Sequence, residues 1–368
     1  MRAGAPPGAG LRRPKGRARE DSQLRSRAGR KANQIAIARA AGVSVSTVSR
    51  ALSNAPGISD ERRTQIRRLA SEAGYLGRGP GRAATRTLLA YVTVSMATGG
   101  LQPFYDAIVK AVGAGAAEAG FALAVRLIDE ATLDLERLER DVVAVEPAAT
   151  LLIGIDPPEA IASHALAGGG PLLLVNGYDP QMRFDGVAPN NFYGGMLATR
   201  QLLQAGHRHL LYVEDHIRWT TVQRRRGFLA AIEETPGAAG TVLGIRDDGD
   251  GRLRAAIGRR QRGEAQWTAA FCVNDNSAIR LIGALEAAGL SVPGDISVIG
   301  FDDLPYAAMM NPPLTSLAVD TAAIGAQAIA LLLRRLAGVD ATPLQVECGL
   351  RLGAGRTIAP LAQTHANS

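Results

Sequence analysis

The chain has 368 residues, of which 46% are hydrophobic and 20% charged, which is enough to build more than one buried core. No run of about 18 apolar residues occurs and no apolar stretch follows Met1, which argues against a transmembrane helix and a signal peptide and predicts a cytoplasmic protein. Residues 1–87 hold 19 of the 41 Lys and Arg residues but only 5 of the 34 Asp and Glu residues, which indicates an N-terminal segment that binds nucleic acid.

The N-terminal region predicts a tail followed by a small helical domain. Residues 1–30 are rich in Arg, Gly and Pro and poor in large apolar side chains, so we expect a disordered basic tail. Residues 31–76 contain three helical stretches, at 34–41, 45–52 and 60–73. Gly42 supplies a tight turn before the second stretch, and Ser44 can cap it. This pattern is typical of a helix-turn-helix DNA-binding domain, and a plain helical hairpin with a solvated serine-rich face is the alternative.

The second helical stretch has the residue types of a recognition helix. Val48 and Leu52 lie four residues apart and face inward, whereas the outward face carries Val45, small hydroxyl residues and Arg50. The N-terminal residues of such a helix meet base edges in the major groove, where an arginine can bond guanine through two nitrogens. We therefore predict that DNA is bound by Ser44, Val45, Ser46, Thr47, Ser49, Arg50, Asn54 and Arg82.

Beyond the helical domain, the pattern indicates a linker and then an α/β core. Residues 77–87 contain Gly and Pro but no large apolar side chain, which predicts a hinge linker. Apolar runs then alternate with amphipathic helical stretches, which is typical of parallel sheets flanked by helices. The expected strands are residues 88–94, 122–128, 150–155, 172–175, 209–213, 269–273 and 296–301.

A break near residues 185–191 divides these strands into two similar halves. We expect an effector-binding core of residues 88–360 with two subdomains, about 88–187 and 190–313. The chain crosses back after residue 314 and ends in a tail of residues 361–368. Two subdomains facing a cleft is the arrangement that this pattern favours.

Several motifs resemble those of the LacI/GalR family of bacterial repressors. The stretch from Ala41 to Leu52 closely resembles the DNA-binding headpiece of that family, and Gly206-His207-Arg208, Asn274-Asp275 and the run from Val292 to Asp303 follow in the family's order. The resemblance covers about residues 33–358. It implies a homodimer or tetramer bound to two-fold operator DNA, and a core like a periplasmic binding protein whose small-molecule effector, a sugar or sugar derivative, controls operator affinity.

The linker departs from the pattern of that family. The family commonly carries a hinge-helix leucine that wedges into the minor groove, whereas residues 77–87 contain no leucine and are shorter than usual. Ala83 and Ala84 are the nearest substitutes, and small side chains kink a duplex less well. Arg82 and Arg86 are expected to contact phosphate or the minor groove instead.

The resemblance also implies an effector site. A sugar needs planar charged groups that bond neighbouring hydroxyls and an aromatic face for its C–H surface. The positions of Phe104, Asn176, Arg224 and Asp275 line the family's cleft, and Trp219 lies upstream of Arg224, where it could add a stacking wall. The first four of these residues have structural alternatives. They are core packing for Phe104, a turn for Asn176, an exposed arginine run for Arg224 and a helix cap for Asp275. Their shared placement at strand ends and helix starts favours the binding role for Arg224 and Asp275.

Other functions are disfavoured by context. The glycine-rich stretch at residues 113–118 lies inside a helical run rather than after a strand, so it does not predict a dinucleotide site. His207 and His209 lack companion ligands, and Cys272 and Cys348 are expected to be buried reduced thiols. We predict no catalysis, no metal and no cofactor. A stand-alone sugar-binding protein is the alternative function, against which the headpiece and the lack of a signal peptide argue.

Overall fold

The fold was analysed in a computed structural model, which describes residues 38–52, 58–59, 62, 65–66, 69, 86–94, 103–245, 250–338 and 342–361. The chain divides into two compact units, Met1–Ala84 and Thr85–Ser368. None of the helices in the described ranges combines the length and apolar character that a membrane span requires. The predictions for the tail of residues 1–30 and for Asn54, Arg82, Ala83 and Ala84 lie outside these ranges.

The described part of the first unit contains the predicted turn and the helix after it. Gly42 has a φ of +63°, and α2 (Val45–Leu52) begins after Ser44, whose Oγ accepts a hydrogen bond from the Thr47 N–H at 3.1 Å. The small core beneath it consists of Ala38, Ala41, Val48, Ala51 and Ile66. Val45 was predicted to face outward, but it is partly buried and packs against this core.

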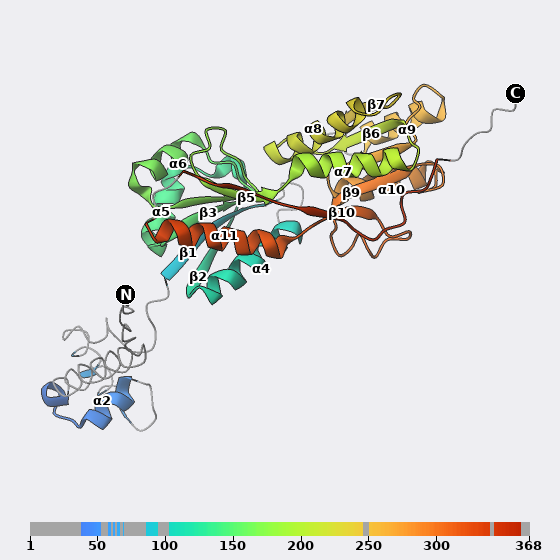
Figure 1. Ribbon diagram of the computed structural model, residues 1–368. Helices are drawn as coiled ribbons and strands as arrows, with labels where there is room; N and C mark the ends of the chain where they lie inside the picture. The colour runs from blue at the N-terminus through green and yellow to red at the C-terminus, as the bar shows by residue number, and fades with distance from the viewer. Residues whose placement is uncertain are drawn as a thin grey trace, which may run out of the picture. The chain divides into compact units, whose positions relative to one another are not determined.

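The second unit is built around two six-stranded sheets, which confirms the predicted α/β class (Figure 1). Sheet A has the strand order β11-β5-β4-β3-β1-β2, and every pair in it is parallel. Its strands are β1 (Arg86–Thr93), β2 (Phe121–Ile128), β3 (Ala149–Ile153), β4 (Leu172–Val175), β5 (Asp185–Pro189) and β11 (Gln345–Cys348).

Helices cover both faces of sheet A, and together they form subdomain 1. Successive residues of a strand point to opposite faces. Accordingly, Leu88 and Ala90 pack with α4 (Pro103–Glu118) and α11 (Thr321–Leu336), whereas Leu89 and Tyr91 pack with α5 (Leu135–Val145) and α6 (Glu159–His164). Burial on both faces explains why the central strands β3 and β4 are apolar runs in the sequence. Two short helical segments, η1 (Glu130–Thr132) and η2 (Ala165–Gly169), complete the subdomain.

Sheet B and its helices form subdomain 2. Its strand order is β12-β10-β9-β8-β6-β7, and only the β10–β12 pair is antiparallel. The strands are β6 (His209–Glu214), β7 (Ala239–Gly244), β8 (Ala269–Cys272), β9 (Ser297–Asp302), β10 (Thr315–Val319) and β12 (Leu350–Leu352). One face packs on α7 (Asn191–Gln204) and α8 (Trp219–Glu233), and the other on α9 (Gly251–Gln261) and α10 (Asp275–Ala287).

The chain passes between the two subdomains three times. It leaves sheet A at Asn190, returns from β10 to α11 at Asp320, and crosses again between β11 and β12 at Gly349. In Figure 1 the dark-red C-terminal strands run from one lobe to the other. The crossing at Asn190 lies inside the break predicted at residues 185–191, which also holds β5 and the start of α7.

The predicted hinge also extends too far. Arg86 and Thr87 already belong to β1, and the Arg86 guanidinium lies 5.4 Å from the centroid of the Phe121 ring. Arg86 is thus part of sheet A and engages an aromatic ring of the same subdomain.

Candidate effector site

The polar residues of the core gather where the parallel strands end. Asn176 follows β4, Asp302 ends β9, and Asp275 begins α10 directly after β8. The carboxyl ends of parallel strands form the ligand crevice of open α/β sheets. Both subdomains therefore present their polar side chains at the edge where a ligand is expected.

Arg224 is a buried charge rather than part of an exposed arginine run. Its side chain extends from α8, with Nε donating to Asn191 Oδ1 at 2.8 Å and Nη1 donating to the Val273 carbonyl at 2.6 Å. Its guanidinium carbon lies 3.6 Å from the Phe301 ring centroid, which is close enough for a cation–π contact. Arg224 is only 4% exposed. These contacts fix the guanidinium in one orientation, as a site that orients a ligand requires.

Asp302 supplies the carboxylate that faces Arg224. Its Oδ1 lies 3.5 Å from Arg224 Nη1 and is buried without a hydrogen-bond partner. Burial raises the pKa of Asp302, and the nearby Asp275 and Asp215 raise it further, while Arg224 acts in the opposite direction. The residue also has a φ of +112°, which is rare for a residue with a side chain. A strained backbone and an unsatisfied oxygen are features that concentrate at binding sites.

Asp275, which was predicted to bind the effector, has both carboxylate oxygens hydrogen-bonded within the protein. Its Oδ2 accepts from the Leu304 N–H at 2.7 Å, its Oδ1 accepts from Ser316 Oγ at 2.5 Å, and the residue is fully buried. Burial raises its pKa as well. A ligand would have to displace these partners to reach it. The role of cap belongs to Asn274, whose side chain accepts from the Ser277 N–H at 2.8 Å. The acceptor that faces the arginine is thus Asp302, and Asp275 fixes the loop after β9.

On the subdomain 1 side, the aromatic residue that contacts Arg218 at the start of α8 is Tyr105 rather than Phe104. Phe104 packs in the core cluster of sheet A and meets the Tyr105 ring edge-on, with centroids 5.3 Å apart. The Tyr105 hydroxyl accepts from Asn176 Nδ2 at 3.3 Å and from Arg218 Nη1 at 2.9 Å. Asn176 has a φ of +53°, and its Oδ1 is buried without a hydrogen-bond partner. Asn176 thus has an acceptor available for a ligand, whereas Phe104 has the structural role that was the alternative.

Two residues at the start of α8 reach across to subdomain 1. Besides its hydrogen bond to Tyr105, Arg218 has Nε 3.6 Å from Glu130 Oε2 and Nη2 3.9 Å from Asp156 Oδ1. Trp219 stacks on Tyr178, with ring centroids 3.8 Å apart and planes inclined by 9°. We refer to Arg218 and Trp219, with their partners Tyr105, Glu130, Asp156 and Tyr178, as the clasp. The predicted stacking residue therefore does stack, but on a tyrosine of the opposite subdomain, and its contact with a sugar stays a prediction.

Asp215 is a further carboxylate at the carboxyl ends of the strands of sheet B, directly after β6. Asp215 accepts from Asn274 Nδ2 at 3.3 Å and from His216 Nδ1. Burial alone would raise the pKa of Asp215, but the hydrogen bond from His216 and its charge lower the pKa to about 2. Asp215 is therefore ionised at neutral pH and adds negative charge beside Asp302.

The sequence reasoning missed Tyr105, Asn191, Arg218 and Asp302. Asp302 is the last residue of β9 and the penultimate residue of the motif that runs from Val292 to Asp303, so an acid at a strand end was the available signal. Arg218 and Asn191 carried no such signal, because both take their roles from contacts with residues distant in the chain.

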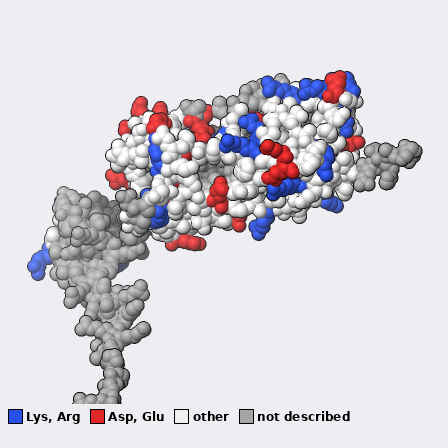
Figure 2. Space-filling view, turned by 45° about the horizontal axis from the view of Figure 1, so that its top comes forward, with Lys and Arg blue, Asp and Glu red and all other residues white. Residues whose placement is uncertain are grey.

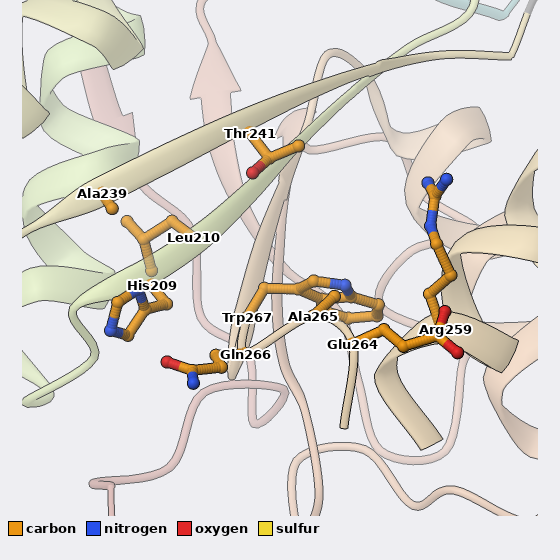
Figure 3. A pocket seen from close by; sticks show the side chains of 9 residues that line it. All are labelled: His209, Leu210, Ala239, Thr241, Arg259, Glu264, Ala265, Gln266 and Trp267. Carbon is orange, nitrogen blue, oxygen red and sulfur yellow. The ribbon is translucent and has the colours of Figure 1, made fainter. Parts of the chain in front are cut away.

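A separate cavity of about 280 Å³ lies at the opposite end of sheet B. It opens beside the first residues of β6 and β7, as Figure 3 shows, away from the strand ends that hold Asp302. It is lined by His209, Leu210, Ala239, Thr241, Arg259, Glu264, Ala265, Gln266 and Trp267. This cavity is thus distinct from the candidate effector site.

The residues considered as metal ligands have structural roles. His207 is buried, with Nδ1 2.8 Å from Thr268 Oγ1 and Nε2 3.0 Å from Ser297 Oγ. No cluster of three or more His, Cys, Asp or Glu side chains within the described ranges has the arrangement to hold a metal ion. Cys272 is a buried free cysteine, and burial raises the pKa of its thiol.

Comparisons with known proteins agree with this architecture. Residues 36–77 match the bacterial regulatory proteins of the lacI family, and residues 199–358 match the periplasmic binding protein-like domain. The HTH-type transcriptional regulator GalR of Salmonella typhimurium is 30% identical over 315 residues, covering 83% of this chain and 90% of GalR. The ribose operon repressor of Haemophilus influenzae is 27% identical over 309 residues, covering 82% and 90%.

Solved structures show the same fold. A complex of the transcriptional regulator CelR with cellobiose has a TM-score of 0.65 at 24% identity, covering 87% of this chain and 98% of that one. The lac repressor dimer bound to operator and the anti-inducer ONPF has a TM-score of 0.66 at 20% identity, covering 88% and 98%. From its headpiece motif, its two-sheet core and its identity to GalR over most of both chains, this chain belongs to the lacI family of bacterial regulatory proteins.

Proposed function

We propose that this protein is a transcriptional repressor that binds operator DNA through its first unit and whose operator affinity is set by a polyhydroxylated effector, a sugar or sugar derivative, bound between subdomains 1 and 2. The relatives support both halves of this proposal, because they include a ribose operon repressor and a regulator solved with cellobiose. Acting on operator DNA places the protein in the cytoplasm.

The observation that carries the effector site is a pair of buried, unpaired acceptors, one of which lies beside a fixed arginine. Asp302 Oδ1 and Asn176 Oδ1 are both acceptors without hydrogen-bond partners, and the Arg224 guanidinium lies next to the former. An unsatisfied buried polar atom costs about 1–3 kcal/mol, which a ligand hydroxyl that donates to it would recover. Two such acceptors, one of them beside a charged plane, suit a ligand with several hydroxyls.

The charge distribution supports DNA binding by the first unit. Residues 1–87 hold an excess of 14 positive charges, which attracts phosphates and releases their counterions. On the face of the second unit shown in Figure 2, positive and negative side chains lie interspersed rather than separated by sign. The solved lac repressor bound to operator is a dimer, so we propose that this chain acts as a homodimer on a two-fold site.

Operator selection with the full chain tests the proposal. Random-sequence duplexes are incubated with the protein, retained DNA is sequenced, and the recovered site is then titrated with and without ribose, cellobiose and a wider panel of sugars. We expect a site with two inverted halves and at least one sugar that changes its affinity. Recovery of DNA without any shared sequence would contradict the DNA-binding half, and a selected site that no sugar affects would contradict the effector half.

A further inference from the structure

The clasp at the start of α8 is the strongest feature that the proposed function leaves unused. Arg218 and Trp219 are neighbours in sequence, yet between them they contact four elements of subdomain 1. Tyr105 belongs to α4, Glu130 to η1, and Asp156 and Tyr178 to the segments that follow β3 and β4. All of these contacts lie at the strand-end edge where Asn176 and Asp302 also lie.

Each half of the clasp is held in place by its own subdomain. In subdomain 2, the Arg218 N–H donates to Thr221 Oγ1 at 2.9 Å, which fixes the backbone at the helix start. In subdomain 1, Asp156 Oδ1 accepts from the Tyr178 N–H at 2.7 Å, and Glu130 Oε1 accepts from the Asp156 N–H at 3.1 Å. Two preformed halves can separate and meet again without either one refolding.

The contacts across the clasp are looser than those within each half. Arg218 makes one hydrogen bond across, to Tyr105, whereas its two carboxylate partners lie at 3.6 and 3.9 Å, and its buried Nε has no hydrogen-bond partner. Burial raises the pKa of Asp156, and the charge of Arg218 opposes that rise. An incompletely satisfied contact is suited to an equilibrium between two arrangements rather than to a permanent core.

We propose that Arg218 and Trp219 form a reversible latch that holds subdomains 1 and 2 closed over the cleft and thereby sets the balance between the two operator-binding states. This inference rests on the proposed function, because only a protein whose core controls DNA binding would use such a balance. β1 in subdomain 1 is the first strand after the first unit, so subdomain 1 is the part of the core that the chain joins to the DNA-binding unit.

The chain offers a direct optical readout of this latch. It has two tryptophans, and Trp267 is buried in the core of subdomain 2. In a Trp267→Phe background, emission therefore comes from Trp219, whose stack on Tyr178 shields it from water and from acrylamide. Opening the latch should shift that emission to longer wavelength and increase its quenching.

The experiment compares Arg218→Ala with Arg225→Ala in the full-length Trp267→Phe chain. Arg225 lies on the same helix and pairs with Glu214 at 2.9 Å inside subdomain 2, so it controls for loss of an arginine ion pair. We expect Arg218→Ala to red-shift Trp219 and raise its quenching, and Arg225→Ala to leave both unchanged. Arg218→Lys retains the charge but cannot reproduce the planar contacts, so it should fall between parent and Arg218→Ala and serves as the second test if the alanine variant does not fold.

Operator affinity without added effector distinguishes a latch from a merely structural contact. We expect Arg218→Ala to change it about fivefold or more, and Arg225→Ala to leave it unchanged. Unchanged Trp219 emission in Arg218→Ala would overturn the latch, and so would changed emission with unchanged operator affinity. If the parent itself bound no specific DNA, the proposed function would fail, while the emission result would still decide whether the two halves separate.

Discussion

At the scale of single residues, Asp302 is where charge, burial and backbone strain coincide. A carboxylate next to Arg224 would ordinarily have a lowered pKa, but burial and two neighbouring carboxylates outweigh the arginine. Asn176 is similar, because a positive φ and an unpaired buried oxygen occur in the same residue. In both residues, the positive φ and the unpaired buried oxygen lower the stability of the fold, and a hydrogen bond from a ligand could offset part of this cost.

The raised pKa of Asp302 predicts a pH-dependent effect of Asp302→Asn on stability. Because its folded-state pKa lies above the unfolded value of 3.8, the group favours folding below that pH and this advantage is lost as pH rises through the folded pKa. Asparagine does not titrate. The free energy of unfolding of the parent should therefore fall relative to that of Asp302→Asn as pH rises above 4, by at least about 1 kcal/mol.

Urea unfolding followed by circular dichroism at a series of pH values measures this difference. A difference between parent and Asp302→Asn that stays constant from pH 4 to pH 9 would refute the assignment.

The sequence points to the strand ends where the candidate site lies, but it does not identify every polar residue that gathers there. Arg224 and Asn176 were predicted from the family motif, and their burial and contacts are consistent with that prediction. Phe104 and Asp275 were chosen over Tyr105 and Asp302. Which of several polar residues faces the cleft depends on the positive φ of Asp302 and on the hydrogen bonds that already occupy Asp275, and neither follows from residue type.

At the scale of elements, prediction succeeded where the sequence contains an apolar run. The seven expected strands correspond to β1, β2, β3, β4, β6, β8 and β9, of which six are interior strands and β2 is an edge strand of sheet A. The strand β5 was missed because its sequence, Asp185–Pro189, contains Gly and Pro and reads as a turn. The edge strand β7 was missed because its residues are largely exposed, which removes the apolar run.

The loop after β9 connects the two subdomains more firmly than its sequence suggests. Asp302 and Asp303 both have positive φ, and this backbone path carries Leu304 into the core cluster of sheet A. The Leu304 N–H is held by Asp275. The segment from Asp302 to Leu304 therefore places Asp302 beside Arg224 and packs Leu304 into subdomain 1.

We predict that Leu304→Ala weakens the cooperation between the subdomains. Loss of this side chain from the cluster should destabilise the core by about 2–3 kcal/mol. It should also broaden or split the thermal unfolding transition in calorimetry, because the subdomains then unfold more independently. Leu281→Ala, at a buried leucine inside subdomain 2, should destabilise without splitting it. A single sharp transition in Leu304→Ala would show that this packing does not join the subdomains.

At the scale of the whole molecule, charge is distributed unequally between the first unit, proposed to bind DNA, and the second unit, proposed to bind the effector. The basic residues concentrate in residues 1–87, and the remaining chain holds more acidic than basic residues. Binding energy that comes from phosphate neutralisation should then depend on the first unit, whereas the ligand acts on the second.

This division predicts a steep salt dependence of operator binding. If a dimer neutralises about 6–10 phosphates, its affinity should fall by about 10³–10⁵ between 50 and 200 mM salt. Fluorescence anisotropy of a labelled operator measures the slope. A flat salt response would exclude a phosphate-dominated interface.

A second prediction concerns the exposed Arg50 on α2, which we propose reads a base edge. Arg50→Ala should reduce the preference for the selected site over random duplex, and the same anisotropy titration measures that preference.

The central claim is that a ligand between the subdomains controls DNA binding by a separate unit. The most direct measurement is an operator titration of the parent and of Asp302→Asn, each with and without the sugar that shifts the parent most. The account predicts that the parent's operator affinity changes about 5–150-fold with that sugar, whereas Asp302→Asn binds operator as the parent does without sugar and does not respond when it is added. A full response in a folded Asp302→Asn protein would contradict the account, because the sugar would then be acting from somewhere other than the cleft beside Arg224.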